Sequence, residues 1–243
     1  MSRNFMSLLL AIALCSALAA SAQATVITGS YQLNAAYTVF NSDLLQTISG
    51  LGVATTGDFT ASGAYTGEPA LRDGTFSSAD CDTTNFAAGG SPSAGSAVTY
   101  TLGAGQYGLG YDITEINTYT GWNQGRCGQA YDVSVHLLGS PAGIFVPLAS
   151  VSYYRNAWDS FPNVPCVSMR VQLSPDVPGG NLAVGVDQVK FDNFLDGGPY
   201  SAWWMSYREL DVSGTPTIPE PSTLVLLATG LIGLLCYAWR KRK

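Results

Sequence analysis

Alternation of apolar and polar residues is the clearest pattern in the central part of the chain. In Tyr131–Leu137 every second residue is apolar, so an extended segment presents one apolar and one polar face, as in a half-buried strand. No segment between the strand candidates has the periodicity of a helix. We therefore predict an all-β fold, an antiparallel β-sandwich or barrel. The other strand candidates, bounded by Gly and Pro turns, are Ala97–Leu102, Asp112–Tyr119, Gly143–Tyr154, Val167–Leu173, Leu182–Phe191 and Met205–Val212.

The first 24 residues have the three parts of a secretory signal peptide. Arg3 gives a basic start, residues 8–20 form an apolar run, and small residues up to Ala24 precede the predicted cleavage site before Thr25. A buried N-terminal helix is the alternative, but it would have to bury an apolar surface on every side. We therefore expect an exported protein, in a compartment where disulfides persist.

A second apolar segment lies at the C-terminal end. Ser222–Trp239 contains 18 residues without a charge, and Arg240–Lys243 is a run of four cations. A helix of this length, rising about 1.5 Å per residue, just spans the hydrocarbon core of a bilayer, with the basic tail on the cytoplasmic side. The predicted organisation is a signal peptide (1–24), a β-sandwich domain (25–214), and a linker followed by a transmembrane helix over 222–239 and the basic tail (215–243).

Charge limits the partners of the exported region. The full chain has 11 Lys and Arg residues against 17 Asp and Glu residues; without the two terminal segments, 6 basic and 16 acidic residues remain. This region lacks the positive footprint that a nucleic-acid partner requires, and it disfavours non-specific binding to anionic lipid. The acidity favours solubility, and some carboxylates are candidates for holding a divalent cation.

The C-terminal segment resembles the PEP-CTERM sorting signal of bacterial surface proteins. The motif residues are Pro219, Glu220 and Pro221, followed by the apolar span and the basic tail. The resemblance implies an exosortase-type enzyme as a processing partner. It also implies that the membrane anchor is transient and that the protein ends at the cell surface or outside the cell. A permanent single-span anchor is the alternative.

Residues 54–214 contain five short pieces in a recognisable order: Leu71–Thr75 with an Asp-Gly turn, Tyr100–Gly103, Asp112–Ile116, Tyr131–Leu137 and the closing strand Tyr207–Gly214. In their order and spacing these pieces resemble galactose-binding-like domains of the discoidin type, which implies a jelly-roll sandwich. The departures are a missing Trp after the Asp-Gly turn, where Phe76 or Phe86 is the nearest aromatic residue, and a low-complexity stretch over 91–96.

The same resemblance implies a structural Ca²⁺ ion. In that family the Asp-Gly turn and the Glu of the last strand often share one calcium, which corresponds here to Asp73, the region of Thr75, and Glu209. Calcium accepts carboxylate and carbonyl oxygens alike, and these positions supply both. The alternative is that Asp73 only forms a turn and that Glu209 is a solvated strand residue.

Three cysteines remain once Cys15 and Cys236 are set aside with the terminal segments. Because three is odd, at most one internal disulfide forms. Cys81 and Cys127 lie in loops that the sandwich places at the same end, so we predict a bridge between them and a free thiol at Cys166.

Catalytic motifs are not evident. His136 is the only histidine, and it lies on the polar face of its strand with Asp132 and Ser134, where we expect an exposed structural residue. No Gly-x-Ser-x-Gly, His-Glu-x-x-His or phosphate-loop motif is present. A glycosidase with a carboxylate pair stays open, because nothing singles out one pair among 16 acidic residues. We expect a protein that is not an enzyme.

Aromatic residues near arginines are candidates for carbohydrate binding. Trp122 lies near Arg126, and Trp158 lies near Arg155. Tryptophan stacks on the C–H face of a sugar while arginine takes its hydroxyls, although a single Trp more often serves packing. We predict a surface or matrix protein whose sandwich binds glycan or exopolysaccharide. The alternatives are a structural coat or biofilm component without a specific ligand and, least favoured, a matrix hydrolase.

Overall fold

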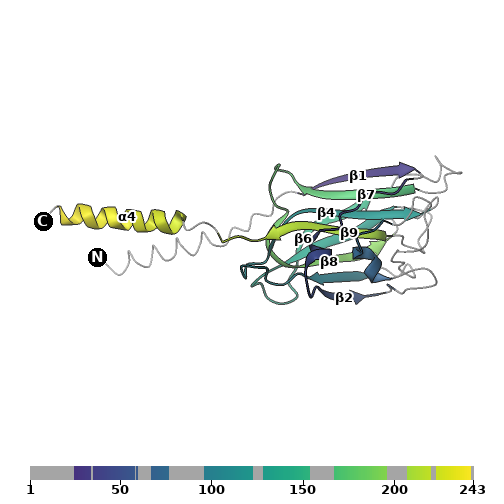
Figure 1. Cartoon of the computed structure of the whole chain (residues 1–243), viewed down its shortest axis with the longest axis horizontal. Coiled ribbons are helices and arrows are strands. Elements are labelled where there is room, and N and C mark those ends of the chain that lie inside the picture. Colours follow the sequence, from purple (N-terminus) through teal and green to yellow (C-terminus); the bar gives the residue numbers. More distant parts are fainter. Residues whose placement is uncertain are drawn as a thin grey trace.

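Strands dominate the computed structural model of the chain (Figure 1). The described strands are β1 (Thr25–Leu33), β2 (Gly52–Thr56), β3 (Ala97–Thr101), β4 (Tyr111–Trp122), β5 (Gln129–Leu137), β6 (Val146–Tyr153), β7 (Val167–Pro175), β8 (Ala183–Leu195) and β9 (Tyr207–Pro216). The helical elements are α2 (Leu44–Thr47), the 3-10 helix η1 (Glu68–Arg72) and α4 (Thr223–Arg240). The structure describes residues 25–33, 35–57, 59, 67–76, 96–122, 128–153, 167–195, 207–219 and 223–241.

The strands form two layers that share one hydrogen-bonded network. One layer has the order β1-β7-β4-β9, and the other has the order β6-β5-β8-β3-β2. The two layers are joined where β4 pairs with β8, at Tyr111↔Val186 and Ile113↔Ala183. All pairings between described strands are antiparallel. The predicted antiparallel β-sandwich is therefore confirmed.

The core lies between the two layers and is made by the apolar face of each strand. In β5 the residues Tyr131, Val133 and Val135 are buried, while the intervening Asp132 and Ser134 are partly exposed. A fully buried Val, Leu, Ile or Phe side chain stabilises the fold by roughly 1.5–3 kcal/mol. The fully buried core residues include Val98, Ile113, Ile116, Val171, Leu173, Val189, Phe191, Leu210 and Val212.

The outer face of β9 is also buried, under a cover whose residues Leu44, Leu45 and Leu71 join the same hydrophobic core. Both α2 and η1 pack on this strand. Asp43 begins α2 with a capping box: its side chain accepts from the backbone N–H of Leu45, and the Gln46 side chain accepts from the backbone N–H of Asp43. Leu44 and Leu45 then turn inward and are buried. This cover makes both faces of β9 inaccessible to water, and the residues of β9 from Tyr207 to Val212 are all buried.

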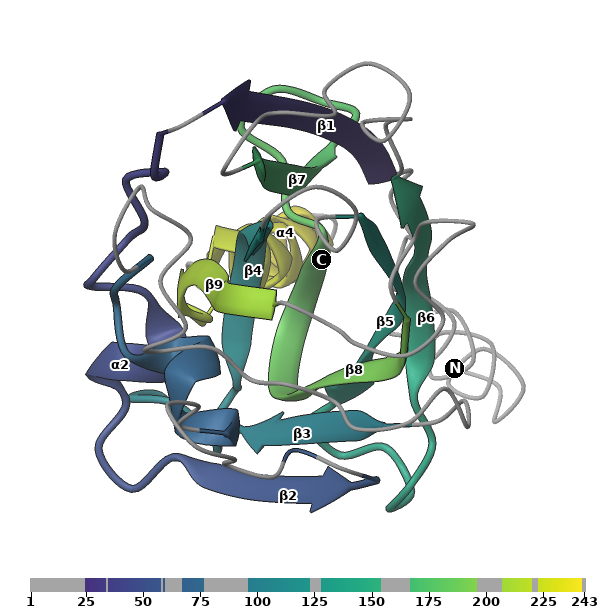
Figure 2. The same ribbon diagram turned by 90° about the vertical axis from the view of Figure 1, so that its right-hand side faces the viewer.

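Different segments of the chain leave from the two ends of the sandwich. At one end β4 finishes at Trp122, β6 finishes at Tyr153, and β5 and β7 begin at Gln129 and Val167. At the opposite end β9 finishes at Pro216, beside the start of β4. Figure 2 views the molecule from the first end, with α4 behind the strands. The C-terminal segment and the segments that follow β4 and β6 therefore leave from opposite ends.

Several boundaries differ from the sequence-based expectation. β1, β2, α2 and η1 were not predicted, and β9 continues to Pro216, two residues beyond the predicted end of the domain. Thr215 still pairs with Asp112, so the first part of the predicted linker belongs to the sheet. In the portion of the chain that the structure describes, none of the helices combines the length and apolarity that crossing a bilayer requires.

Candidate metal centre and ligand-binding end

The Asp-Gly turn and the last strand meet, as the resemblance implied. The backbone N–H of Gly74 donates to Oε1 of Glu209 over 3.1 Å, and the Gln46 side chain donates to the same oxygen over 2.8 Å. Gly74 has a φ of +74°, and a Cβ at this position would lie 3.1 Å from Cβ of Asn41. The turn therefore favours glycine on two counts: backbone conformation and close approach.

Asp73 and Thr75 are placed differently from Glu209. Asp73 is exposed, and its Oδ1 accepts from the backbone N–H of Thr75 over 2.8 Å and from the Thr75 hydroxyl over 2.7 Å. This is an Asx turn, in which the carboxylate stabilises the loop itself. Glu209, in contrast, is fully buried. The expectation of a solvated strand residue at position 209 is wrong, because the α2–η1 cover lies over it.

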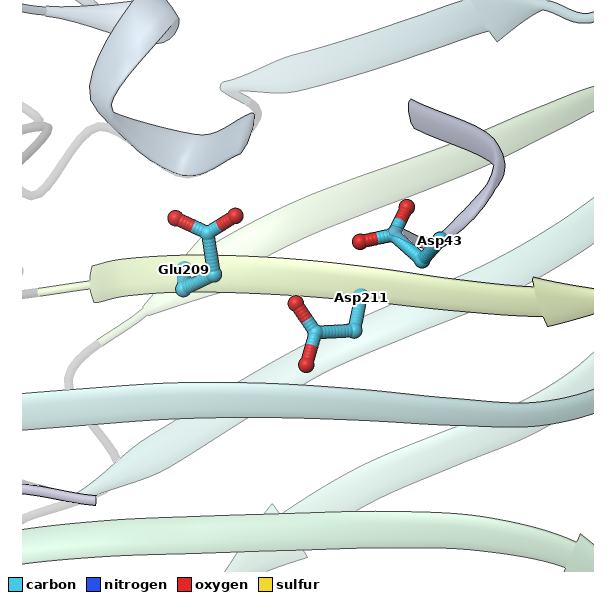
Figure 3. A group of neighbouring side chains, drawn as sticks. All are labelled: Asp43, Glu209 and Asp211. Carbon is cyan, nitrogen blue, oxygen red and sulfur yellow. The ribbon is translucent and has the colours of Figure 1, made fainter. Parts of the chain in front are cut away.

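Two further carboxylates join Glu209 in the buried region under this cover (Figure 3). Asp211 lies two residues along β9, so its side chain leaves the strand on the same face. Asp43 reaches the site from the N-terminus of α2. One carboxylate oxygen from each of Asp43, Glu209 and Asp211 lies within 4.8 Å of the others, and we call these three residues the acidic triad.

Each member of the acidic triad has one oxygen satisfied by the protein and one that is not. Asp43 Oδ1 accepts from the N–H of Leu45, and Asp211 Oδ2 accepts from the N–H of Phe40 over 3.0 Å. Among the described residues, Asp43 Oδ2, Glu209 Oε2 and Asp211 Oδ1 are buried without a hydrogen-bond partner. A buried polar oxygen without a partner costs roughly 1–3 kcal/mol, and more when it is charged. Three such oxygens in one buried acidic cluster favour either protonation or a bound cation.

Burial raises the pKa values of the acidic triad, and repulsion between carboxylates adds to the rise for Asp211 and Glu209. Desolvation is the largest cause in each case, and it raises the pKa of Asp43 to about 6 and that of Asp211 to about 7. The pKa of Glu209 rises to about 10, because burial outweighs the hydrogen bond from Gly74 and the nearby Asp211 and Asp43 add repulsion. In the absence of a cation Glu209 is therefore protonated at neutral pH, and Asp43 and Asp211 titrate close to neutrality.

The triad fits a hard divalent cation such as calcium. Ca²⁺ binds oxygen ligands at roughly 2.3–2.6 Å, so two oxygens on one ion are separated by at most about 5 Å. One oxygen of each triad member meets that limit, and each member has one buried oxygen without a hydrogen-bond partner among the described residues. The sequence identified Glu209 but missed its two partners. Asp211 was detectable from its i+2 spacing to Glu209. Asp43 was not, because its segment shows no periodic pattern.

The strands that flank the predicted carbohydrate contacts finish or begin at one end of the sandwich. The backbone of Trp122 ends β4, and Tyr153 ends β6. Arg126 lies in the segment between β4 and β5, and Arg155 and Trp158 lie in the segment between β6 and β7. These three residues fall outside the described residues, as do Cys81, Cys127, Cys166, Glu220 and Pro221, whose roles stay predictions. Pro219 is described and exposed.

His136 is buried rather than exposed, which corrects the expectation for it. Its Nδ1 lies 2.6 Å from Oδ1 of Asp187, and its Nε2 lies 3.2 Å from the carbonyl oxygen of Pro141. The hydrogen bond with Asp187 raises the pKa of His136, because a protonated ring can donate from both nitrogens. The ring also packs edge-on against Phe145, with 5.8 Å between centroids. Nδ1 thus holds β5 to β8, and Nε2 holds β5 to the turn that follows β5.

Comparisons with solved structures find distant likenesses. They include a module from Clostridium perfringens, CpGH89CBM32-6, with 15% identity over 70% of this chain and 98% of that chain and a TM-score of 0.39. Chitosan-binding module 1 of a chitosanase/glucanase from Paenibacillus sp. IK-5 has 12% identity over 71% and 98%, with a TM-score of 0.44. The family 32 carbohydrate-binding module of C. perfringens NanJ, solved with galactose, has 14% identity over 67% and 92%, with a TM-score of 0.40. These likenesses say nothing about the ligand of this chain.

The C-terminal segment gives a direct match. No curated protein matches the sequence. A family model described as the PEP-CTERM protein-sorting motif, however, matches residues 217–243, the segment that contains Pro219 and α4. The chain therefore carries a PEP-CTERM sorting motif at its C-terminus, as the resemblance in the sequence indicated.

Proposed function

We propose that the protein is an exported, non-catalytic binding module for an extracellular glycan, sorted to the cell surface through its PEP-CTERM motif. The observation that carries the proposal is the placement of the two chain regions at opposite ends of the sandwich. The segments with Trp122, Arg126, Arg155 and Trp158 leave from one end, and the sorting motif leaves from the other.

The join between the domain and the motif supports this arrangement. The backbone N–H of Thr217 donates to the carbonyl oxygen of Gly110 over 2.9 Å, and its hydroxyl donates to Oδ1 of Asp112. The first residue of the matched motif is thus bound to the start of β4. A domain held in this way presents its opposite end outward, where a polysaccharide is accessible.

In this proposal α4 is the membrane anchor. Its side chains from Leu231 to Leu235, and those of Tyr237 and Trp239, are exposed, although most of them are apolar. An exposed apolar surface of this extent needs a covering partner. The membrane would cover this surface, with Ser222–Trp239 as the inserted segment. The cover would last until an exosortase-type enzyme cuts the chain near Pro219.

A structural calcium ion belongs to the same proposal. Asp43, Glu209 and Asp211 would hold it, and its charge would replace the protons that the acidic triad otherwise needs. The ion would link the start of α2, through Asp43, to the last strand and so stabilise the domain, while the Gly74 N–H holds the 67–76 segment to Glu209. Asp73 and Thr75 would keep the turn in shape without ligating through the Asp73 oxygen that Thr75 already occupies.

A glycan array tests the proposed function. The full chain, solubilised in a detergent without a sugar headgroup, is applied to bacterial polysaccharides and their oligosaccharides. Selective binding to a glycan supports the proposal. An absence of binding, together with multimers in solution, would favour the structural coat component instead.

A further inference from the structure

The outward face of the β6-β5-β8 layer carries a pocket. It has a volume of about 390 Å³, within the range of roughly 300–1,000 Å³ that is typical of small-ligand sites. Its lining includes Asp132, Ser134, Phe145, Leu148, Ser150 and Asp192. The pocket lies on the side of β5 that faces away from the core, in the middle of a strand, so it is distinct from the end with Trp122 and from the acidic triad.

Two β-bulges on either side of β5 shape the pocket. In β6 the register shifts opposite Val133 and Ser134, which pair with Ala149 and Pro147, so Leu148 is an extra residue. In β8 the register shifts between the partners of Ala130 and Asp132. Bulges bend a strand and redirect its side chains. The flat outer face of the sheet is hollowed here because both neighbours of β5 are bent.

The β8 bulge also fixes the carboxylates of the pocket. Asn193 has a φ of +54°, the only positive φ of a non-glycine residue in the described segments. Its side-chain amide donates to Oδ2 of Asp132 over 2.7 Å, and its backbone N–H donates to Oδ1 of Asp192 over 2.8 Å. Hydrogen bonds from Asn193 and Ser150 lower the pKa of Asp132, which is therefore ionised at neutral pH. Two carboxylates thus hold set positions beside the pocket.

The remaining wall is apolar, and the charge of the site is negative. Phe145, Pro147 and Leu148 supply apolar surface, and the Phe145 ring is fixed against His136. The ammonium of Lys190 pairs with Asp192 and balances one of the two carboxylates. The site keeps one net negative charge, which repels uronic acids and phosphates and attracts an ammonium group.

We propose that this pocket binds one pyranose unit that carries a free amine, as in a de-acetylated hexosamine chain. It does so independently of the outer end of the sandwich, the end where β4 finishes at Trp122 and β6 finishes at Tyr153. The apolar wall matches the C–H face of the sugar ring. Asp132 accepts from the protonated amine, and Ser134 and Ser150 contact the hydroxyls. This site adds to the proposed glycan binding and does not depend on it, because no residue is shared.

Calorimetry with the full chain in a zwitterionic detergent tests the proposal. The probes are the disaccharide of glucosamine, its di-N-acetylated form and a digalacturonate. We expect the free amine form to bind at least tenfold more tightly than the other two. The D132N/D192N double variant should lose at least tenfold in affinity, whereas the exposed control Asp176→Asn and the outer-end variant Trp122→Ala should not.

A second variant guards against a folding defect. Ser150→Trp fills the pocket without removing a charge, because Ser150 pairs with Asp132 on the outer face and is exposed. It should abolish binding while the melting temperature stays within a few degrees of the wild type. The proposal is overturned if the glucosamine disaccharide does not bind the wild type, or binds D132N/D192N equally well. It is also overturned if Asp176→Asn weakens binding as much as the double variant does, because general charge attraction would then explain the effect. If Trp122→Ala alone removes binding, the outer end holds the sugar and the pocket does not.

Discussion

The backbone N–H of Gly74 donates to the carboxylate of Glu209 across 135 positions of the sequence. This bond fastens the turn after η1 to the last strand of the sandwich. It also engages one oxygen of Glu209, while the second oxygen is buried without a partner in a residue that lies beside Asp43 and Asp211. The contact therefore links the fold of the cover to the candidate metal centre.

The first prediction concerns calcium. An ion that binds only the folded state stabilises it by about 2.7 kcal/mol when free calcium is a hundredfold above Kd, so chelation should lower the melting temperature by several degrees. Glu209→Gln and Asp211→Asn should remove most of this sensitivity to chelator. Asp176→Asn is a matched control on the surface, and it should behave like the wild type.

The variant Asp73→Asn tests whether the calcium ligands come from the acidic triad or from the Asp-Gly turn. Because Asp73 is exposed and bonded to Thr75, this variant should retain the sensitivity to chelator. If Asp73→Asn removes the sensitivity and Asp211→Asn does not, the ion belongs to the turn. An identical melting temperature of the wild type in calcium and in chelator, after metal analysis shows removal, would mean that no ion is held.

The second prediction concerns pH. The raised pKa values mean that the metal-free folded protein keeps protons that the unfolded chain releases above about pH 4. The free energy of unfolding should therefore fall as the pH rises above about 4. The contributions of Asp43 and Asp211 level off near their folded-state pKa values of about 6 and about 7, and that of Glu209 continues toward about 10. The slope is about 1.4 kcal/mol per pH unit for each group that is protonated only in the folded state.

Saturating calcium should remove this slope, because the cation replaces the protons. Urea denaturation at pH 5 and pH 8, with calcium or with chelator, measures both effects. A metal-free protein that is more stable at pH 8 than at pH 5 would contradict the assigned protonation of the triad.

The third prediction concerns His136, whose pKa is raised by Asp187. A raised histidine pKa stabilises the fold below the unfolded value of about 6.5, and this stabilisation is lost as the pH rises through the folded value. His136→Gln should therefore cost more stability at pH 5.5 than at pH 8.5, and Asp187→Asn should remove that difference. Since His136 is the only histidine, its ring protons in NMR report the pKa directly, and a value at or below 6.5 would refute the assignment.

Much of the sheet was predictable from local pattern. In β5 the alternation of Tyr131, Val133 and Val135 with polar residues carries its own signal, because one face is buried and the other meets water. β1 gives no such signal, because it lies at a sheet edge where Val26 and Ile27, on opposite faces, are both exposed. Glu209 and Asp211 also break the pattern, since a cover supplied by distant segments buries the polar face of their strand.

The site was therefore predictable only in part. Glu209 came from a family resemblance, and its burial came from the packing of α2 and η1, neither of which has a periodic sequence. The pocket beside Asp132 depends on two register shifts, which are set by pairing between strands and leave no local signature in the sequence. The burial of Glu209 and the shape of the pocket thus depend on tertiary packing, which the alternation pattern does not report.

The fourth prediction concerns processing. Protein recovered from the producing cells should begin at Thr25 and lack Leu224–Lys243, because the signal peptide and the PEP-CTERM anchor are both removed. Intact-mass analysis of the exported protein measures both ends at once. A full-length C-terminal tail in the exported protein would instead indicate a permanent anchor.

The central claim is that the outer end of the sandwich binds a glycan. The most direct measurement is the affinity of the full chain for its best array ligand, compared with Trp122→Ala and with Tyr107→Ala. Tyr107 is a matched control, because it is an exposed aromatic residue in the turn between β3 and β4 at the opposite end. The account predicts at least a tenfold loss of affinity in Trp122→Ala and no change in Tyr107→Ala. Equal affinities of all three proteins would contradict it.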